Sequence, residues 1–564
     1  MKILDAYRLL FTPLSPLHIG SGESYEPTNY VIEEDTLYEF DTGAVVEALS
    51  DADRKDLLAL SSRRPNQEMI KGVQKYFHER REVIMPWAIH RIPVLDGVAS
   101  LYRKTIGRAA NIEESGRQVL NRLEIDRTAC NPVSREPLLF GSSLKGAIRT
   151  ALLDKINDGA GLSSRNEKNL ELQQRLFKYQ RGKFELDPMR LVHLSDAAWR
   201  GEGHLPTAQV FLAVNRKKDP VCDAHGKLRA SKAESGPDQI LECVPALRYR
   251  VFEGELRLQS VSGVDAANKL PAADRRFDAL AIARACNAFY RPILISEMQR
   301  LGERGYLSEP WKETVGALLE DARLASGEAF LLRVGRHSGA ESVTLRGVRN
   351  IKITRGQGQP PDYGQEALTA WLAASERGQQ TGLLPFGWLF VEIAPLSAGA
   401  IPDHQTLRDA CARQMEPALE WSRSMAGKHA AWEAAKLAAE ARLREEAEAL
   451  RRRAEAQEQA ARAEAEREAR MATMSANMRR VEEFKAAFAS RAEQLRGRKE
   501  RLNADYHTRA RQLAKDALEG ADWTAEEKRA VADAMAEWLP KVVEKIDKDQ
   551  FKKLKLAALR GGGS

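Results

Sequence analysis

The pattern of apolar and polar positions divides the chain at about residue 400. Before that point, short apolar and β-branched runs alternate with glycine-rich loops and with segments of helical periodicity. Such runs predict strands, which we expect at Tyr7–Thr12, Asn29–Ile32, Thr36–Phe40, Arg190–Leu194, Ala208–Val214, Tyr249–Phe252, Glu255–Leu258, Ala329–Val334 and Trp388–Ile393. We expect helices over Gly43–Leu60, Leu144–Ile156, Ala272–Leu301 and Ala367–Arg377, the third broken or kinked at Pro292. Strands interleaved with helices predict an α+β architecture in which helices cover the sheets.

The remaining residues have a helical pattern throughout. Neither Gly nor Pro occurs in Lys428–Ser475, which is rich in Ala, Glu and Arg, so one continuous helix is predicted. Its sparse large apolar residues, Leu437, Leu443 and Leu450, are six and seven residues apart. This weak heptad fits both a solvated charged helix and a coiled coil. Larger apolar residues return after residue 475 and predict a small helical bundle.

Composition narrows the class of protein. The 564 residues carry a net charge of +7, which modestly favours a polyanionic partner. No stretch of about 20 apolar residues occurs and the N-terminus has no signal-peptide core, so we expect a cytoplasmic protein without a membrane span. The five cysteines form no C-x-x-C pair, which argues against a zinc site or a disulfide framework.

The segment Phe140–Arg149 (FGSSLKGAIR) combines helix-start and phosphate-binding features. Ser142 or Ser143 is suited to cap a helix, whose N-terminal N–H groups and partial positive charge favour anions. Lys145 and Arg149 lie one turn apart and add full charges. The same pattern fits a capped amphipathic helix with a solvated basic face, and spacing alone favours that second interpretation. It is not a nucleotide P-loop, because only three residues separate Gly141 from Lys145.

Two further segments pair glycines with polar residues. The loop Leu17–Gly22 follows a strand, and its glycines allow backbone N–H groups to face a phosphate or a base. His18 fits either a hydrogen-bonded loop histidine, which we favour, or a general acid/base for RNA cleavage. In the later segment Leu332–Gly339, Arg333, Arg336 and Ser338 are suited to phosphate contacts, although a solvated basic hairpin fits equally well. No metal-binding or nucleophile motif stands out, so we expect no metal, no cofactor and no catalytic site.

Several of these motifs resemble those of a known protein family. His18–Gly22 together with Gly141–Arg149 resembles the RAMP superfamily of CRISPR-associated proteins, although Phe140 replaces the proline often found before that glycine. Val192–Ala197 resembles the strand-end motif of type III backbone subunits.

Two later segments narrow the resemblance. Arg333–Thr344 and Leu384–Trp388 are similar to the family of terminal capping subunits, subunit five, of type III-A (Csm) complexes. The resemblance covers about residues 1–400 and does not explain the helical extension. It implies RRM-like, ferredoxin-like folds with insertions. Together with the helical extension, we therefore expect four divisions of the chain: residues 1–200 and 201–400 as two RRM-like regions, 401–475 as a long charged helix, and 476–564 as a helical domain.

The resemblance also implies a function. It implies a non-catalytic subunit that caps the 3′-end side of the complex, binds guide RNA (crRNA) and, through the guide, target RNA, and supports guide maturation. It implies contact with the neighbouring repeated backbone subunit and with a host maturation nuclease, and a thumb hairpin near Arg117–Arg135. The implied RNA contacts are His18, Gly20, Ser21, Gly22, Ser142, Ser143, Lys145, Arg149, Arg333, Arg336, His337 and Ser338. The alternative is a repeat-processing endoribonuclease that uses His18.

Overall fold

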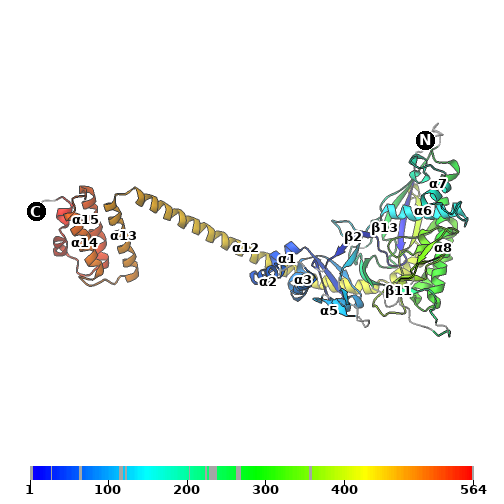
Figure 1. Cartoon of the computed structure of the whole chain (residues 1–564), viewed down its shortest axis with the longest axis horizontal. Coiled ribbons are helices and arrows are strands. Elements are labelled where there is room, and N and C mark those ends of the chain that lie inside the picture. The colour runs from blue at the N-terminus through cyan, green and yellow to red at the C-terminus, as the bar shows by residue number, and fades with distance from the viewer. Residues whose placement is uncertain are drawn as a thin grey trace. The chain divides into compact units, whose positions relative to one another are not determined.

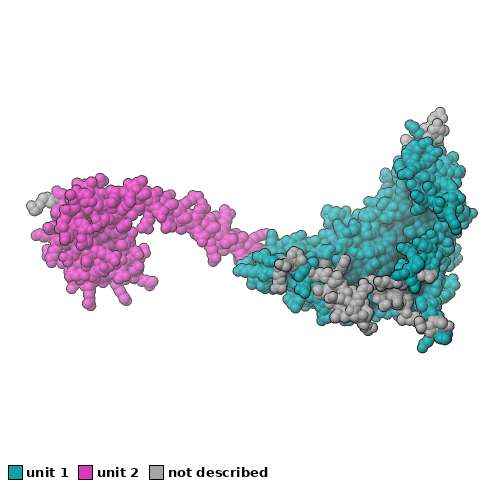
Figure 2. All heavy atoms as spheres, in the orientation of Figure 1, with its two compact units in different colours: residues 1–441 teal, residues 442–564 magenta. Residues whose placement is uncertain are grey.

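The computed structural model divides into two compact units, residues 1–441 and residues 442–564 (Figure 2). It describes residues 4–26, 28–62, 66–108, 110–112, 118–120, 123–201, 203–222, 225–227, 238–261, 269–354 and 358–561. Mixed sheets and helices form the first unit, and helices form the second (Figure 1). The chain is therefore an α+β protein with a helical C-terminal region, as the sequence predicts.

The first sheet is built around β1 (Leu4–Pro13), which lies between two antiparallel neighbours. One neighbour is β13 (Phe252–Gln259) and the other is β19 (Trp388–Pro395). The order is β10–β13–β1–β19–β14, with β9 also paired to β13; β9, β10 and β14 span Val192–Leu194, Ala198–Trp199 and Ala329–Arg333. The sheet therefore joins strands from both sides of residue 200, and the expected division into regions 1–200 and 201–400 does not separate its strands.

Two helices pack together beside this sheet. Helix α6 (Gly141–Asn157) buries Leu144, Ile148 and Leu152, the stripe that its periodicity predicts. Helix α8 (Ala279–Glu303) packs on α6, where the Tyr290 hydroxyl donates to the Ala147 carbonyl at 3.1 Å. Pro292 lies inside α8 without ending it.

The second sheet has the order β18–β17–β11–β12–β8–β2, and only its β12–β8 pair is parallel. These strands span Leu384–Pro385, Thr369–Ala374, Gln209–Lys217, Gln239–Cys243, Ile125–Thr128 and Gly20–Tyr25. The helix expected over Ala367–Arg377 is wrong, because this Ala-rich segment pairs with β11 from Leu212↔Ala374 to Lys217↔Thr369. Burial in the sheet outweighs the helix propensity of alanine.

A third sheet, β3–β4–β5 (Tyr30–Glu33, Thr36–Phe40, Ala88–Pro93), packs against short helices. The single helix expected over Gly43–Leu60 is instead α1 (Thr42–Ala48) and α2 (Asp51–Ser61), because Ser50 caps α2. The other elements of this unit are α3 (Gln67–Glu79), α4 (Arg81–Ile84), α5 (Asp96–Thr105), β6 (Ala110–Ile112), β7 (Gln118–Leu120), α7 (Asn169–Phe177), α9 (Glu309–Leu319), α10 (Ala322–Ser326), β15 (Ile351–Ile353), β16 (Asp362–Gly364) and α11 (Gln405–Arg413).

Helix α12 (Glu416–Thr473) crosses the boundary between the units and confirms the predicted uninterrupted helix. Its residues 444–470 are exposed, so this stretch is a solvated charged helix in the chain as described. The helices that follow are α13 (Ala476–Leu495), α14 (Asp505–Glu519), α15 (Ala525–Val542), α16 (Lys548–Lys553) and α17 (Leu556–Leu559). They share one apolar core, which includes Phe488, Met535 and Leu539. None of the described helices has the length and apolar character needed to cross a bilayer.

Candidate nucleic-acid interface

The loop after β1 is held by main-chain pairing and by a buried histidine. Leu17 exchanges two main-chain hydrogen bonds of 2.9 Å with Val244. His18 is 1% exposed, and its Nδ1 lies 2.8 Å from the Glu242 carbonyl oxygen, so Nδ1 carries the proton that is donated. Burial lowers the pKa of His18. This geometry makes His18 a loop anchor and leaves it no exposed face for the acid/base chemistry of the alternative hypothesis.

The glycines that follow His18 lie on the surface. Gly20, Ser21 and Gly22 are exposed at the start of β2, the edge strand of the second sheet. The Ser21 hydroxyl donates to the Arg127 carbonyl at 3.3 Å. An edge strand presents main-chain N–H groups without ladder partners, and such groups are donors for an anionic ligand.

The late glycine segment lies directly against this loop. The Arg336 N–H donates to the His18 carbonyl at 2.9 Å. A Cβ on Gly335 would lie 2.3 Å from that same carbonyl oxygen, and its φ of +83° also favours glycine. Two segments more than 300 residues apart in sequence are thereby joined into one surface.

The side chains of the late segment divide between surface and core. The Arg336 guanidinium is 39% exposed and pairs with Asp126. Arg333, in contrast, is 4% exposed, and its guanidinium bonds Glu297 and the Phe386 carbonyl, both at 2.9 Å. The expected RNA contact at Arg333 is therefore not available on the surface, because its donors are used inside the protein.

His337 and Ser338 are half-buried. The His337 ring stacks on Trp371 at 4.7 Å between centroids, and its Nε2 lies 3.1 Å from Gln239 Oε1. Burial and the nearby Arg336 charge lower the pKa of His337 to about 3, so the ring is neutral at physiological pH. A neutral, stacked His337 fits a role in holding the loop better than one as a phosphate counter-charge.

Helix α6 begins differently from the prediction. Neither Ser142 nor Ser143 caps it; the Gly141 N–H donates at 2.7 Å to Asp196 Oδ1, in the Val192–Ala197 segment. A Cβ on Gly141 would lie 2.6 Å from the Leu194 carbonyl oxygen. The helix start therefore fits against this strand end, and a carboxylate already serves one of its N–H groups.

The two cations in the first half of α6 also differ from each other. Arg149 is used internally: its Nη1 bonds Asp187 at 2.9 Å and its Nε bonds Gln173 at 3.0 Å. Lys145 is half-buried, and no ion pair or hydrogen bond joins its ammonium to another described side chain. Burial lowers the pKa of Lys145, although Asp187 partly opposes the shift. Of these two residues, Lys145 is therefore the one that remains available to a ligand.

A buried polar cluster beneath the loop was not predicted from sequence. The Tyr25 hydroxyl donates to Glu242 Oε1 at 2.9 Å, and the Thr128 N–H donates to Oε2 at 3.0 Å. Burial raises the pKa of Glu242 to about 7. Arg127 pairs with Glu39 at 3.0 Å and lies over the Tyr25 ring. These residues come from four separate segments and share no motif, so only the fold brings them together.

We call the accessible part of this site the glycine-loop interface: Gly20, Ser21, Gly22, Ser142, Lys145 and Arg336. Main-chain links connect its two sides, because Ala129 donates to the Ile19 carbonyl at 2.6 Å and Leu138, just before α6, donates to the Ala129 carbonyl at 2.9 Å. The set offers N–H and hydroxyl donors with two cations. Such a set is suited to contacts with an anionic polymer.

The chain is thus an α+β protein, and the glycine-loop interface is a candidate surface for anion binding. Comparison with known families adds that residues 10–256 match the RAMP superfamily model, so this part of the chain is similar to that superfamily. The matched range contains the first glycine loop and α6, and it ends before the late loop and the helical extension. No curated protein matches the chain.

Two solved structures are similar in part. One is a chain of a Csm–crRNA–target RNA ternary complex of a type III-A CRISPR-Cas system, at 17% identity and a TM-score of 0.42, covering 69% of this chain and 100% of that one. The other is Csm5 from T. onnurineus, at 16% identity and a TM-score of 0.39, covering 68% of this chain and 99% of that one.

Proposed function

We propose that this chain is a non-catalytic guide-RNA-binding subunit that caps the 3′-end side of a type III-A CRISPR (Csm) effector complex. The observation that carries the proposal is the contact between the two glycine segments, in which the Arg336 N–H donates to the His18 carbonyl. It occurs in a chain whose residues 10–256 match the RAMP superfamily model. That contact places exposed donors and the Arg336 guanidinium on one surface. Neither glycine segment alone supplies both the exposed donors and the guanidinium.

The strand order supports an RRM-like, ferredoxin-like unit at the centre of the proposal. In chain order, β1, α6, β9, β13, α8 and β19 follow the β-α-β-β-α-β plan. In the sheet these four strands lie in the order β9–β13–β1–β19, so the second, third, first and fourth strands of the plan are neighbours. Strand β14 extends the sheet beyond β19, and the second sheet is carried by the insertions.

The proposed binding is electrostatic and independent of sequence. Main-chain N–H groups at Gly20–Gly22 and the Ser142 hydroxyl donate to phosphate oxygens, while Lys145 and Arg336 supply charge. When a phosphate binds, Arg336 gives up its ion pair with Asp126. The free-energy cost is small because both side chains of that pair are partly exposed. Contacts of this kind suit a subunit that holds guides of many sequences.

The proposed partners are the guide, the target RNA paired to it, the neighbouring repeated backbone subunit and a host maturation nuclease. We place the chain in the cytoplasm, where such a complex works. The thumb hairpin expected near Arg117–Arg135 falls partly outside the described residues, since 117, 121 and 122 are among those not described.

The test is a double substitution, Lys145→Ala with Arg336→Ala, in the full chain. Removing two cations that neutralise phosphates lowers the salt slope of single-stranded RNA binding by about 1.4, at about 0.7 per phosphate. The matched control is Lys55→Ala with Arg103→Ala, which removes the same two residue types from exposed positions on α2 and α5. Affinity and salt slope equal to those of the control would overturn the proposal.

A further inference from the structure

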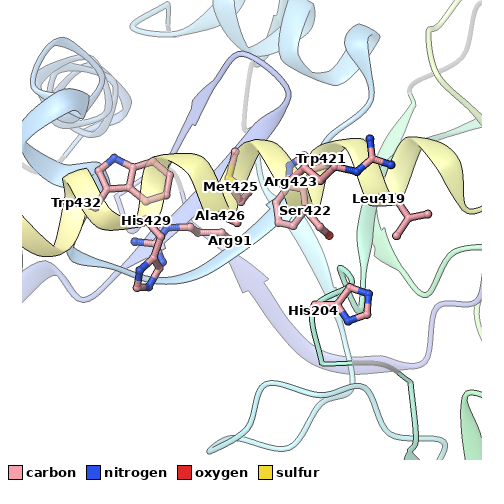
Figure 3. Close-up of a pocket in the computed structure, with 10 residues that line it drawn as sticks. All are labelled: Arg91, His204, Leu419, Trp421, Ser422, Arg423, Met425, Ala426, His429 and Trp432. Carbon is pink, nitrogen blue, oxygen red and sulfur yellow. The ribbon is translucent and has the colours of Figure 1, made fainter.

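A cavity lies along the first turns of α12 (Figure 3). Its volume of about 590 Å³ is in the range of small-molecule sites. Its lining residues are Arg91, His204, Leu419, Trp421, Ser422, Arg423, Met425, Ala426, His429 and Trp432. All of them belong to the first unit, and none belongs to the glycine-loop interface. This is therefore a separate site, built by the extension that the family resemblance does not explain.

All of the ionisable side chains that line this cavity are basic. Four of the lining residues, Arg91, His204, Arg423 and His429, are basic, and none of the ten is acidic. Two of these basic side chains lie close to a carboxylate: Arg423 pairs with Glu416 at 2.8 Å, and the His429 ring lies 3.9 Å from Glu433. These pairs are exposed and contribute little, so an anion can replace the glutamates at small cost.

Two tryptophans supply flat apolar surface, and both are fixed by neighbours. Trp432 packs edge-on against Tyr38 at 5.7 Å and carries the Arg91 guanidinium over its ring at 4.6 Å. The Trp421 indole N–H donates to Thr36 Oγ1 at 2.9 Å. Both side chains are half-buried, so part of each remains accessible. A ring already held in place loses little entropy when a ligand stacks on it.

We propose that this cavity binds a nucleotide of single-stranded RNA. The base stacks on an accessible tryptophan face, and Arg423 and His429 each contact an adjoining phosphate. Aromatic surface beside arginine matches the joined base and phosphate of a nucleotide, because the planar guanidinium bonds phosphate oxygens in pairs. The identity of the polymer as RNA rests on the proposed function, whereas the position of the site does not.

The experiment uses the full chain and an oligouridylate that contains 4-thiouridine, photocrosslinked and mapped by mass spectrometry. Crosslinks are expected in peptides that contain Trp421 or Trp432. The variant Arg423→Ala with His429→Ala should lower both affinity and crosslink yield about fivefold or more, and the salt slope by about 0.7 for each phosphate that is no longer neutralised. The control, Arg451→Ala with Arg462→Ala, removes two exposed cations that are paired with glutamates on the same helix, and should change neither.

Two results would overturn the inference: crosslinks confined to other segments, or equal loss in the variant and its control. Displacement of the oligouridylate by polyglutamate as readily as by unlabelled RNA would also overturn it, in favour of an acidic protein partner. Failure of the proposed function is recognised separately. In that case the Lys145→Ala, Arg336→Ala variant keeps full guide binding, whatever is found for the crosslinks at α12.

Discussion

Replacing Arg333 should destabilise the fold, whereas replacing Arg336, three residues later, should not. Arg333 lies over the Trp388 ring and pairs with Glu297 at 2.9 Å, and the same carboxylate accepts from the Trp388 indole N–H at 2.8 Å. Arg333→Met removes the charge partner of a carboxylate that is 7% exposed. Breaking one side of a buried pair costs about 3–5 kcal/mol, whereas an exposed pair such as Arg336–Asp126 contributes about 0–1 kcal/mol.

The assay is urea unfolding followed by tryptophan fluorescence, with RNA binding measured on the same samples. Arg333→Met should lower the free energy of unfolding by about 3–5 kcal/mol, and Arg333→Met with Glu297→Gln should recover most of that loss, because the uncompensated charge is gone. Arg336→Met should unfold like the wild type and bind RNA more weakly. An Arg333→Met protein with unchanged unfolding and weakened RNA binding would refute the assignment of Arg333 to the core.

Two further perturbations test the parts that position the interface. Burial raises the pKa of Glu242 to about 7, so the folded state keeps a proton that the unfolded state releases near the ordinary carboxyl pKa. The free energy of unfolding should therefore fall as pH rises from about 4.5 to 7, by up to about 3 kcal/mol at about 1.4 kcal/mol per pH unit. Glu242→Gln should abolish this pH dependence in unfolding curves recorded across that window. Gly141→Ala places a methyl group 2.6 Å from the Leu194 carbonyl oxygen and should lower the free energy of unfolding by about 1–3 kcal/mol. Gly146→Ala, on the same helix with open space around it, should be neutral or stabilising in the same measurement. Equal effects of the two substitutions would contradict the close approach at Gly141.

The sequence predicts those elements whose apolar pattern is local. The runs at β1, β14 and β19 are strands, and the α6 stripe is buried, because side-chain periodicity and burial agree there. The pattern fails at Thr369–Ala374, where an Ala-rich segment becomes a strand through its pairing with β11. Such pairing joins residues distant in sequence and leaves no local signal.

The segments that form the glycine-loop interface can be recognised in the sequence, but the positions of their individual side chains cannot. Arg333 ends a run, Ala329–Arg333, in which every residue is buried, and a charge inside such a run requires a buried partner. That signal was present in the sequence and separates Arg333 from Arg336. The capping role of Asp196, 55 residues from Gly141, depends on how the strand end meets the helix, and no spacing rule predicts it.

The most direct test of the central claim is the RNA that accompanies the full chain from cells with an active CRISPR array. Purification of wild type, of Lys145→Ala with Arg336→Ala, and of the control Lys55→Ala with Arg103→Ala, each followed by RNA sequencing, compares the three under one condition. A guide-binding subunit retains short RNAs with a uniform 5′ sequence in wild type and control, and loses them in the interface variant. RNA of random sequence, or equal retention in all three proteins, would contradict guide binding at this interface.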